Sequence, residues 1–223
     1  MATYVLVHGI CHGAWCWELT IDDLSDLGHS VIAVDLALET LDGDAEIVEN
    51  VLDAIDEPVV LVGHSYGGAV ISKAAAGRTD VDHLVYVAAI MLDGSTALTE
   101  QLANFPLPDT GQSIAISAEG IVTVSPEAAR ALFYNTCTQE ASDAASAQLR
   151  PTAFAVLATP TGAEPWHDIV STYVVCDQDN AIHPDLQRAM AANAKQVITI
   201  DTDHSPFMSA TDAFRDALLT TLT

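Results

Sequence analysis

Residues 63–67 read Gly-His-Ser-Tyr-Gly, which places Ser65 between two glycines. An apolar run, 58–62, comes directly before this motif, and a run rich in small residues, 69–76, follows it. A serine at a sharp turn between a strand and a helix sits in strained backbone geometry, and flanking glycines remove side chains that would collide there. This context favours a nucleophile elbow, with Ser65 as the nucleophile, over an ordinary glycine-rich turn.

A serine hydroxyl is a poor nucleophile unless a base takes its proton and a third group orients that base. Among eight histidines, His204 is the favoured base. It follows the last apolar run, 197–200, at the edge where ligands gather in an open α/β sheet. His64 adjoins Ser65, but its side chain is expected to follow the strand into the packing. Asp201 and Asp203 flank His204 too closely in sequence to face its ring.

The candidate acids lie in the loops after two earlier apolar runs. Asp177 and Asp179 follow the run 173–175, and Asp93 stands after the run 84–87. An aspartate in such a loop can fix the tautomer of the base and stabilise the imidazolium that forms. The position after 173–175 is favoured, and Asp93 remains the alternative.

The oxyanion of an acyl-transfer reaction needs two hydrogen-bond donors, which an elbow of this type draws from backbone amides. These donors are predicted to be the amides of Tyr66 and of Ile10, the latter in the loop 8–15. His8 and His12 are four residues apart, as in some metal-binding helices. Here they lie on a glycine-broken loop rather than on a helix, so neither a metal site nor a cofactor is predicted.

These residues require a scaffold, and the hydrophobic pattern supplies one. Short apolar, β-branched runs occur at 4–7, 31–34, 59–62, 84–87, 173–175 and 197–200. Helical patterns alternate with them at 15–27, 44–55, 66–76, 184–194 and 209–219. Buried strands that alternate with helices at this spacing predict an α/β fold with a doubly wound, mostly parallel sheet.

The alternation breaks between Asp93 and Asp168, where helical patterns punctuated by proline cover 98–105, 126–134 and 139–149. An insertion of this length predicts a helical lid at about 94–167, within a single domain that spans 1–223. Its aromatic residues can line an apolar pocket, although packing is their commoner role: Phe105, Phe133, Tyr134, Phe154 and Trp166. No substrate-binding residue is assigned from the sequence.

The chain has 223 residues, of which 31 are acidic and 7 basic, for a formal net charge of −24. Nucleic acid is therefore nearly excluded as a partner, because phosphate binding needs clustered Lys and Arg, and anionic membrane surfaces are disfavoured likewise. The acidic residues are scattered among apolar ones, as on a folded, solvated surface. Adaptation to high salt is the expected meaning of this charge, and a merely acidic, soluble enzyme is the alternative.

Other sequence features predict a cytoplasmic protein that does not span a membrane. The residues after Met1 include no basic segment of a signal peptide, and no apolar run reaches the 18 residues of a membrane span. The four cysteines form no CxxC pair, which favours free thiols. The expected partner is a small-molecule ester, and a homodimer is left open.

Four segments together resemble one subfamily of α/β-hydrolases, that of plant methylesterases, hydroxynitrile lyases and bacterial carboxylesterases. They are the loop 7–15, the elbow 63–68, the stretch 173–182 and the stretch 203–207. The resemblance implies the α/β-hydrolase fold. It also selects Asp179 over Asp177, because the acid of that subfamily stands three residues before an isoleucine such as Ile182.

The resemblance also bears on the reaction. The lyases of the subfamily carry a threonine where this chain has Gly9 and a lysine where it has Ser205. Both differences point to ester hydrolysis. The expected function is a carboxylesterase-type serine hydrolase that cleaves esters of small apolar substrates through an acyl-enzyme, with Ser65, Asp179 and His204 as its triad. The alternatives are a hydroxynitrile lyase-type C–C lyase and a non-catalytic ligand receptor on the same scaffold.

Overall fold

The computed structural model describes residues 1–97, 99–100 and 114–222. Within these residues, six parallel strands form a central sheet in the spatial order β2-β1-β3-β4-β8-β9. The strands are β1 (Thr3–Val7), β2 (Ser30–Val34), β3 (Val59–His64), β4 (Val81–Val87), β8 (Val170–Cys176) and β9 (Gln196–Ile200). The chain winds outward in both directions from β1, so the strand order reverses between β1 and β3. Ligands of open α/β sheets bind at such a reversal.

The burial of the strands explains the apolar runs in the sequence. Every residue of β1 and β3 is buried, because helices cover both faces of the sheet there. The edge strands β2 and β9 are partly exposed and carry fewer buried side chains. The predicted α/β class with a doubly wound parallel sheet is confirmed.

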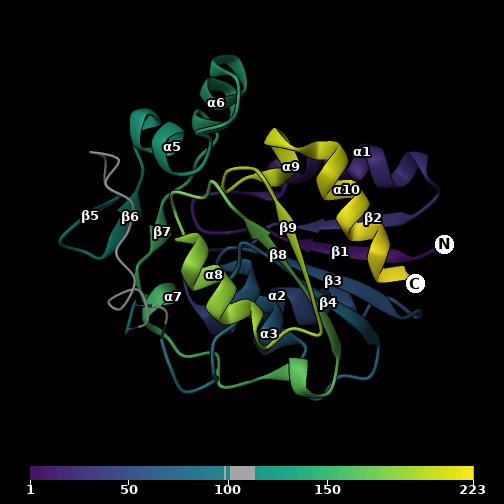
Figure 1. The fold of residues 1–223 in the computed structure, drawn as a ribbon. Helices are drawn as coiled ribbons and strands as arrows, with labels where there is room; N and C mark the ends of the chain where they lie inside the picture. Colours follow the sequence, from purple (N-terminus) through teal and green to yellow (C-terminus); the bar gives the residue numbers. More distant parts are fainter. Residues whose placement is uncertain (98, 101–113, 223) are drawn as a thin grey trace.

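Helices cover the two faces of the sheet (Figure 1). On one face lie α1 (Glu18–Asp26), α9 (Pro206–Ser209) and α10 (Thr211–Leu219). On the other lie α2 (Leu41–Leu52), α3 (Gly67–Ala74) and α8 (Pro184–Ala191). The short 3-10 helices η1 (Ala14–Trp17) and η3 (Thr220–Leu222) precede α1 and follow α10. Each face therefore has its own apolar core.

Local backbone conformation and capping set two helix ends that hydrophobic periodicity alone misplaces. The helix predicted at 44–55 starts at Leu41, because the Thr40 hydroxyl accepts a hydrogen bond from the Gly43 amide and caps the first turn. The helix predicted at 209–219 corresponds to α10, which starts at Thr211 because Ala210, with a φ of −146°, is not helical, and α9 ends just before it at Ser209.

Residues 114–153, in the segment between β4 and β8, lie beside the carboxyl ends of the central strands, and the end of the segment runs back to the start of β8 (Figure 1). This segment contains α5 (Pro126–Leu132), α6 (Gln139–Ser146), α7 (Ala155–Ala158) and η2 (Pro165–His167). It also contains a small antiparallel sheet that the sequence analysis missed, made of β5 (Ala115–Ile116), β6 (Ile121–Thr123) and β7 (Thr152–Ala153). Strands of two or three residues are too short to show alternation. The helix predicted at 98–105 lies for the most part outside the described residues.

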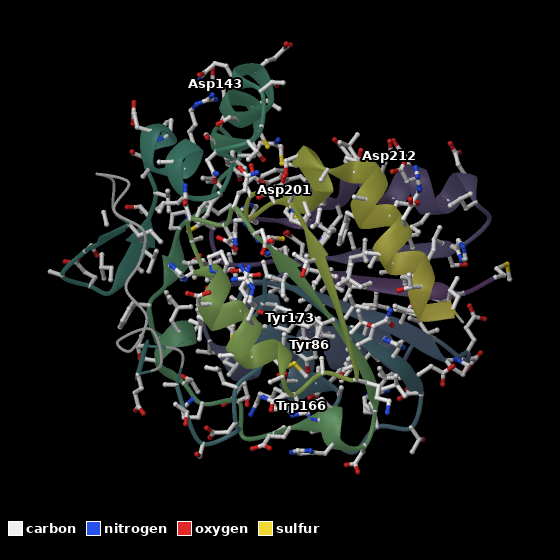
Figure 2. The ribbon with its side chains drawn as sticks, in the orientation of Figure 1. Tyr86, Asp143, Trp166, Tyr173, Asp201 and Asp212 are labelled. Carbon is white, nitrogen blue, oxygen red and sulfur yellow. The ribbon has the colours of Figure 1, made fainter. Side chains whose placement is uncertain are left out.

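Figure 2 labels three aromatic side chains of the interior and three aspartates nearer the surface. Tyr86 stacks on Tyr173, with ring centroids 6.4 Å apart, and Trp166 meets Tyr86 edge-on at 6.1 Å. Asp143 and Asp201, in contrast, are exposed.

None of the helices in the described part of the chain is long and apolar enough to cross a membrane.

Candidate active site

Ser65 lies at the turn between β3 and α3, and its backbone is in the left-handed region, with φ at 53°. A residue with a β-carbon rarely adopts this conformation, so the surrounding structure must hold it there. The turn also leaves no room for a side chain at Gly63, where a β-carbon would lie 2.5 Å from the carbonyl oxygen of Gly67. The motif thus forms a sharp strand-to-helix turn with Ser65 at its apex.

Two hydrogen bonds fasten this turn to the end of β4 and to the segment that follows it. The Ser65 amide donates to the Val87 carbonyl over 3.1 Å, and the Ile90 amide donates to the Ser65 carbonyl over 3.0 Å. Ser65 itself is 8 % exposed. These contacts compensate for the backbone strain and leave the hydroxyl group in a cavity instead of in bulk solvent.

His204 and Asp179 follow the neighbouring strands β9 and β8, so their loops meet at one edge of the sheet. His204 Nδ1 lies 2.6 Å from Asp179 Oδ2, and both side chains are buried. A carboxylate only accepts, so Nδ1 carries the proton of the neutral imidazole. This tautomer leaves Nε2 free to take a proton, and Ser65 lines the same cavity as His204.

Asp179 is itself held in place by three further donors. Its Oδ1 atom accepts from the amides of Ala181 and Ile182, at 2.7 and 2.9 Å. Its Oδ2 atom accepts from Nε2 of the buried Gln187 at 2.7 Å. Gln187 was missed by the sequence analysis, because nothing in its position on α8 marks it as different from a solvent-facing glutamine.

The other candidate acids have partners elsewhere. Asp177 is exposed and pairs with Arg188 at 2.5 Å. Asp93 is exposed and accepts hydrogen bonds from the hydroxyls of Ser95 and Thr96. The geometry therefore places Asp179, not Asp177 or Asp93, at His204.

Ile10 and Tyr66 follow β1 and β3, the two strands between which the sheet order reverses. Both residues line the cavity that contains Ser65. Gly9 allows the close approach of the two loops, because a β-carbon there would lie 2.7 Å from Ser65 Cβ. The Tyr66 hydroxyl donates to the buried Asp44 carboxylate at 2.8 Å, which anchors the residue that carries one predicted oxyanion donor.

Three further buried histidines surround the site, and each has a tautomer fixed by hydrogen bonding. His8 and His12 donate from Nδ1 to carbonyls of their own loop, at 2.8 and 2.9 Å. His64 donates from Nε2 to the His204 carbonyl at 2.8 Å. Burial lowers the pKa of His8 to about 4, that of His12 to about 3, and that of His64 well below its ordinary value. All three are neutral at pH 7.

These depressed pKa values predict a loss of stability in mild acid. In the unfolded chain the three histidines take up protons near pH 6.5, whereas in the folded chain they do so only at much lower pH. The unfolded state therefore binds more protons below pH 6.5. Each histidine then removes up to about 1.4 kcal/mol of unfolding free energy per pH unit.

Urea unfolding at pH 7.5, 6.5 and 5.5, at constant ionic strength, measures this effect. Surface carboxylates are still largely ionised in that range. A free energy of unfolding that stays constant or rises as the pH falls to 5.5 would contradict the assignment of neutral buried histidines. Replacing the exposed His167 with glutamine is the matched control, and this variant should show the same pH dependence as the wild type.

The cavity beside Ser65 has a volume of about 90 Å³. Apart from the site residues, its walls are mostly apolar and include Ile114, Phe133, Leu157 and Ile182. The first three come from the segment between β4 and β8. No lysine, arginine, aspartate or glutamate from the described part of the chain lines this cavity.

The aromatic residues considered for a pocket have different positions. Phe133 lines the cavity, and the Tyr134 hydroxyl donates to His12 Nε2 at 2.8 Å. Phe154 and Trp166 pack against the core on the face of the sheet that α2, α3 and α8 cover. Phe105 lies outside the described residues.

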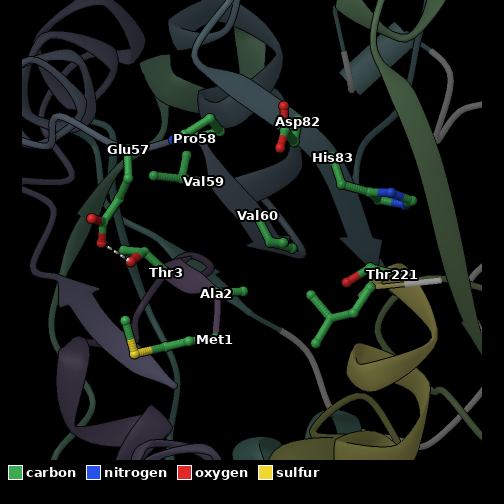
Figure 3. Close-up of a pocket in the computed structure, with 11 residues that line it drawn as sticks. Met1, Ala2, Thr3, Glu57, Pro58, Val59, Val60, Asp82, His83 and Thr221 are labelled. Carbon is green, nitrogen blue, oxygen red and sulfur yellow. Dashed lines mark hydrogen bonds between the residues drawn. The ribbon is translucent and has the colours of Figure 1, made fainter. Parts of the chain in front are cut away.

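A larger cavity, of about 490 Å³, lies at the amino ends of β1, β3 and β4, near both chain termini (Figure 3). It includes the Thr3 hydroxyl, which donates to Glu57 at 2.6 Å, and Asp82 and His83. It is at the opposite edge of the sheet from Ser65, so it has no part in the chemistry proposed below.

Among the described residues, no group of three or more His, Cys, Asp or Glu side chains is arranged to hold a metal ion.

The sequence of this chain matches a known protein family. The sequence model described as "Alpha/beta hydrolase family" matches residues 4–217, from β1 into α10. The chain belongs to this family of α/β hydrolases. The predicted fold and family resemblance are therefore confirmed.

Curated relatives of this α/β hydrolase include plant esterases. Methylesterase 7 of Arabidopsis thaliana is 31 % identical to it, with 92 % of this chain and 90 % of the relative covered. Methyl jasmonate esterase 1 of Vitis vinifera is 30 % identical, with 92 % and 91 % covered. Among solved structures, polyneuridine aldehyde esterase superposes with a TM-score of 0.86 at 25 % identity, covering both chains fully.

In this α/β hydrolase, hydrogen bonds fasten the segment between β4 and β8 to the loops that carry His204 and Asp179. The buried Asp203 carboxylate accepts from the Thr136 amide at 2.8 Å and from the Ser205 amide at 3.0 Å. Asn180 Nδ2 donates to the Ala131 carbonyl at 2.9 Å. Sequence reasoning missed these links, because aspartate and asparagine are common in loops for many other reasons.

Proposed function

We propose that this α/β hydrolase is a serine carboxylesterase, with Ser65 as nucleophile, His204 as base and Asp179 as the acid that orients it. The observation that carries the proposal is the hydrogen bond from His204 Nδ1 to the buried Asp179, beside a cavity that Ser65 enters in left-handed backbone geometry. The esterase names of the relatives support the same chemistry.

In the first half-reaction, Ser65 Oγ bonds to the ester carbonyl carbon while His204 Nε2 takes the hydroxyl proton. The electron pair of the carbonyl bond moves to its oxygen, which the amides of Ile10 and Tyr66 stabilise. The intermediate collapses, the bond to the alkoxy oxygen breaks, and His204 gives its proton to the leaving alcohol. Asp179 stabilises the imidazolium in between.

In the second half-reaction, a water molecule attacks the acyl carbon of the acyl-enzyme. His204 Nε2 accepts a proton from this water and then returns it to Ser65 Oγ as the bond between serine and acyl group breaks. The products are the free acid and the restored enzyme. No metal or cofactor is needed for this cycle.

The expected substrates carry small, uncharged, apolar acyl groups. The cavity walls are mostly apolar, and no cationic side chain of the described residues faces it. A carboxylate buried there would lose its hydration without gaining a counter-ion. The formal net charge of −24 also opposes the approach of anionic substrates.

Two esters of similar length test this substrate class, namely methyl pentanoate and monomethyl succinate. We expect kcat/KM for the charged ester to be lower by at least about 100-fold, the effect of an unpaired buried carboxylate. The measurement is acid release by pH-stat at two salt concentrations, since screening weakens long-range repulsion but not the desolvation of a buried charge. Comparable values for the two esters would overturn the assignment.

The same preparation tests the lyase alternative with mandelonitrile. Ser205 is fully buried and uncharged, so no cation stands beside His204 at that position to stabilise a departing cyanide. We expect no cyanide release above the uncatalysed background. The receptor alternative is refuted by multiple turnovers of any ester.

A further inference from the structure

Arg150 lies between α6 and β7, where the segment between β4 and β8 returns to the central sheet. Its guanidinium group donates from Nε to the His12 carbonyl at 3.0 Å and from one Nη to the Leu36 carbonyl at 2.9 Å. The other Nη donates to Asp35 at 3.2 Å. Two of these three acceptors are backbone atoms, in the loops after β1 and β2.

The backbone of Arg150 and the side chain of Thr152 hold the middle of the loop after β1. The Arg150 amide donates to the Cys11 carbonyl at 2.7 Å, and the Thr152 hydroxyl accepts from the Cys11 amide at 2.9 Å. Cys11 has φ at 62°, a conformation that a residue with a β-carbon rarely adopts. Residues 150–152 therefore hold both sides of a strained peptide that directly follows Ile10.

Every carbonyl from Gly9 to His12 receives a hydrogen bond. The first two receive theirs from His8 and His12 within the loop. The last two receive theirs from the amide and the side chain of Arg150. A peptide group is planar, with its N–H and C=O on opposite sides. The Ile10 amide shares its peptide group with the Gly9 carbonyl, which His8 holds, and one Nη of Arg150 lies 3.4 Å from His8 Nε2. Arg150 therefore fixes the peptide groups after Ile10 directly and acts on the Ile10 amide through this loop.

Arg150 differs in this respect from other cationic residues of this acidic chain. Arg78, Arg188 and Arg215 each pair with two carboxylates that are themselves partly or largely exposed. Arg150 has a side chain that is 35 % exposed, and two of its side-chain hydrogen bonds go to main-chain carbonyls. It does not line the cavity beside Ser65.

We propose that Arg150 is a positioning residue that clamps the loop after β1 to the start of β7 and so aims the Ile10 amide at the oxyanion. The inference rests on the proposed function, in which that amide is an oxyanion donor. Arg150 acts through the loop and does not touch the substrate. The planar guanidinium can reach both loop carbonyls at once, which the single ammonium group of lysine cannot do.

The variants Arg150→Gln and Arg150→Lys test this role, with Arg78→Gln as the matched control. Arg78→Gln removes the same charge and two carboxylate partners, far from the loop after β1. The readouts are kcat, KM and the affinities for two ketones of equal chain length. A trifluoromethyl ketone forms a hemiketal oxyanion with the serine, whereas the parent methyl ketone binds without forming one.

We expect Arg150→Gln to lower kcat and the trifluoromethyl ketone affinity together, each by about 10- to 100-fold. Outright removal of an oxyanion donor costs about 10²- to 10³-fold, which sets the upper limit for a misaimed one. KM and the methyl ketone affinity should change less than about threefold. Arg150→Lys should fall between Arg150→Gln and the wild type, and Arg78→Gln should match the wild type in all four quantities.

Equal losses of affinity for the two ketones, or no loss for either, would overturn the clamp. A merely structural role would lower the amount of folded enzyme and affect both ketones alike. Failure of the proposed function has a different signature, because the wild type would then show no turnover that depends on Ser65. The two hypotheses can therefore fail separately.

Discussion

Replacing Ser65 with alanine is expected to lower kcat for ester hydrolysis by several orders of magnitude while the fold is kept. Only one oxygen atom is lost, and the hydrogen bonds that fix the turn come from the backbone of Ser65. The remaining rate reflects binding and the oxyanion donors, which in other serine hydrolases give a residual acceleration of about 10³- to 10⁴-fold over water. Steady-state kinetics with a p-nitrophenyl ester measures the effect.

Ser72→Ala is the matched control for this variant. Ser72 is also buried, on α3 of the same elbow, but its hydroxyl donates to the Gly68 carbonyl and contacts the Tyr86 hydroxyl, away from the cavity. We expect kcat of Ser72→Ala to stay within a few fold of the wild type. If Ser65→Ala retains more than a tenth of the wild-type kcat, Ser65 is not the nucleophile.

Asp179→Asn is the second large effect, with an expected loss in kcat of about 10³- to 10⁴-fold. An asparagine amide cannot stabilise the imidazolium. Its carbonyl oxygen would have to replace Oδ1, which accepts two backbone amides, or Oδ2, which accepts from His204 and Gln187. In the first case the new NH2 group faces His204 and Gln187, which favours the wrong tautomer of His204, and in the second it faces two backbone amides that also donate.

The controls for this prediction are Asp177→Asn and Asp93→Asn, both at exposed carboxylates with partners of their own. Each should retain nearly all of the wild-type kcat. A profile in which Asp93→Asn is the inactive variant and Asp179→Asn is not would transfer the role of the acid to Asp93.

The central sheet could be predicted because its signals are local. The runs that became β1, β3 and β4 are apolar and largely β-branched, since helices cover both faces of those strands. The position of Ser65 followed from the same pattern, because a glycine-flanked serine between an apolar strand and a small-residue helix has few other structural meanings. His204 followed from its place after the last strand.

The residues that support the site could not be predicted, because their roles depend on how separate elements pack against one another. Gln187 meets Asp179 only because α8 packs beside β8, and Arg150 meets the loop after β1 from a segment 138 residues away. Neither residue type is distinctive in its local sequence. The choice of Asp179 over Asp177 needed the family resemblance, since both follow the same strand, and the structure separates them by burial.

The segment between β4 and β8 was predicted least well, for a similar reason. Its small sheet is built from strands of two or three residues, and β7 is held in place by main-chain pairing with β6 and by the contact of Ala153 with Leu38. Short strands of this kind leave no periodic signal. The apolar contribution of Phe133 and Leu157 to the cavity likewise appears only when the segment folds back over the sheet.

Covalent trapping of the nucleophile tests the central claim most directly. The wild-type protein, Ser65→Ala and Ser72→Ala are each treated with diethyl p-nitrophenyl phosphate. The nucleophilic serine of a serine hydrolase attacks the phosphorus of this triester and expels p-nitrophenol. The diethylphosphoryl group that remains on the serine is hydrolysed only slowly. Intact and peptide mass spectrometry then locate the label. We predict one diethylphosphoryl group per wild-type chain, on the peptide that contains Ser65, with a parallel loss of ester hydrolysis. Ser72→Ala should give the same result. Ser65→Ala should carry no label. Full labelling of Ser65→Ala at another residue, or a wild-type enzyme that stays active and unlabelled, would contradict the account.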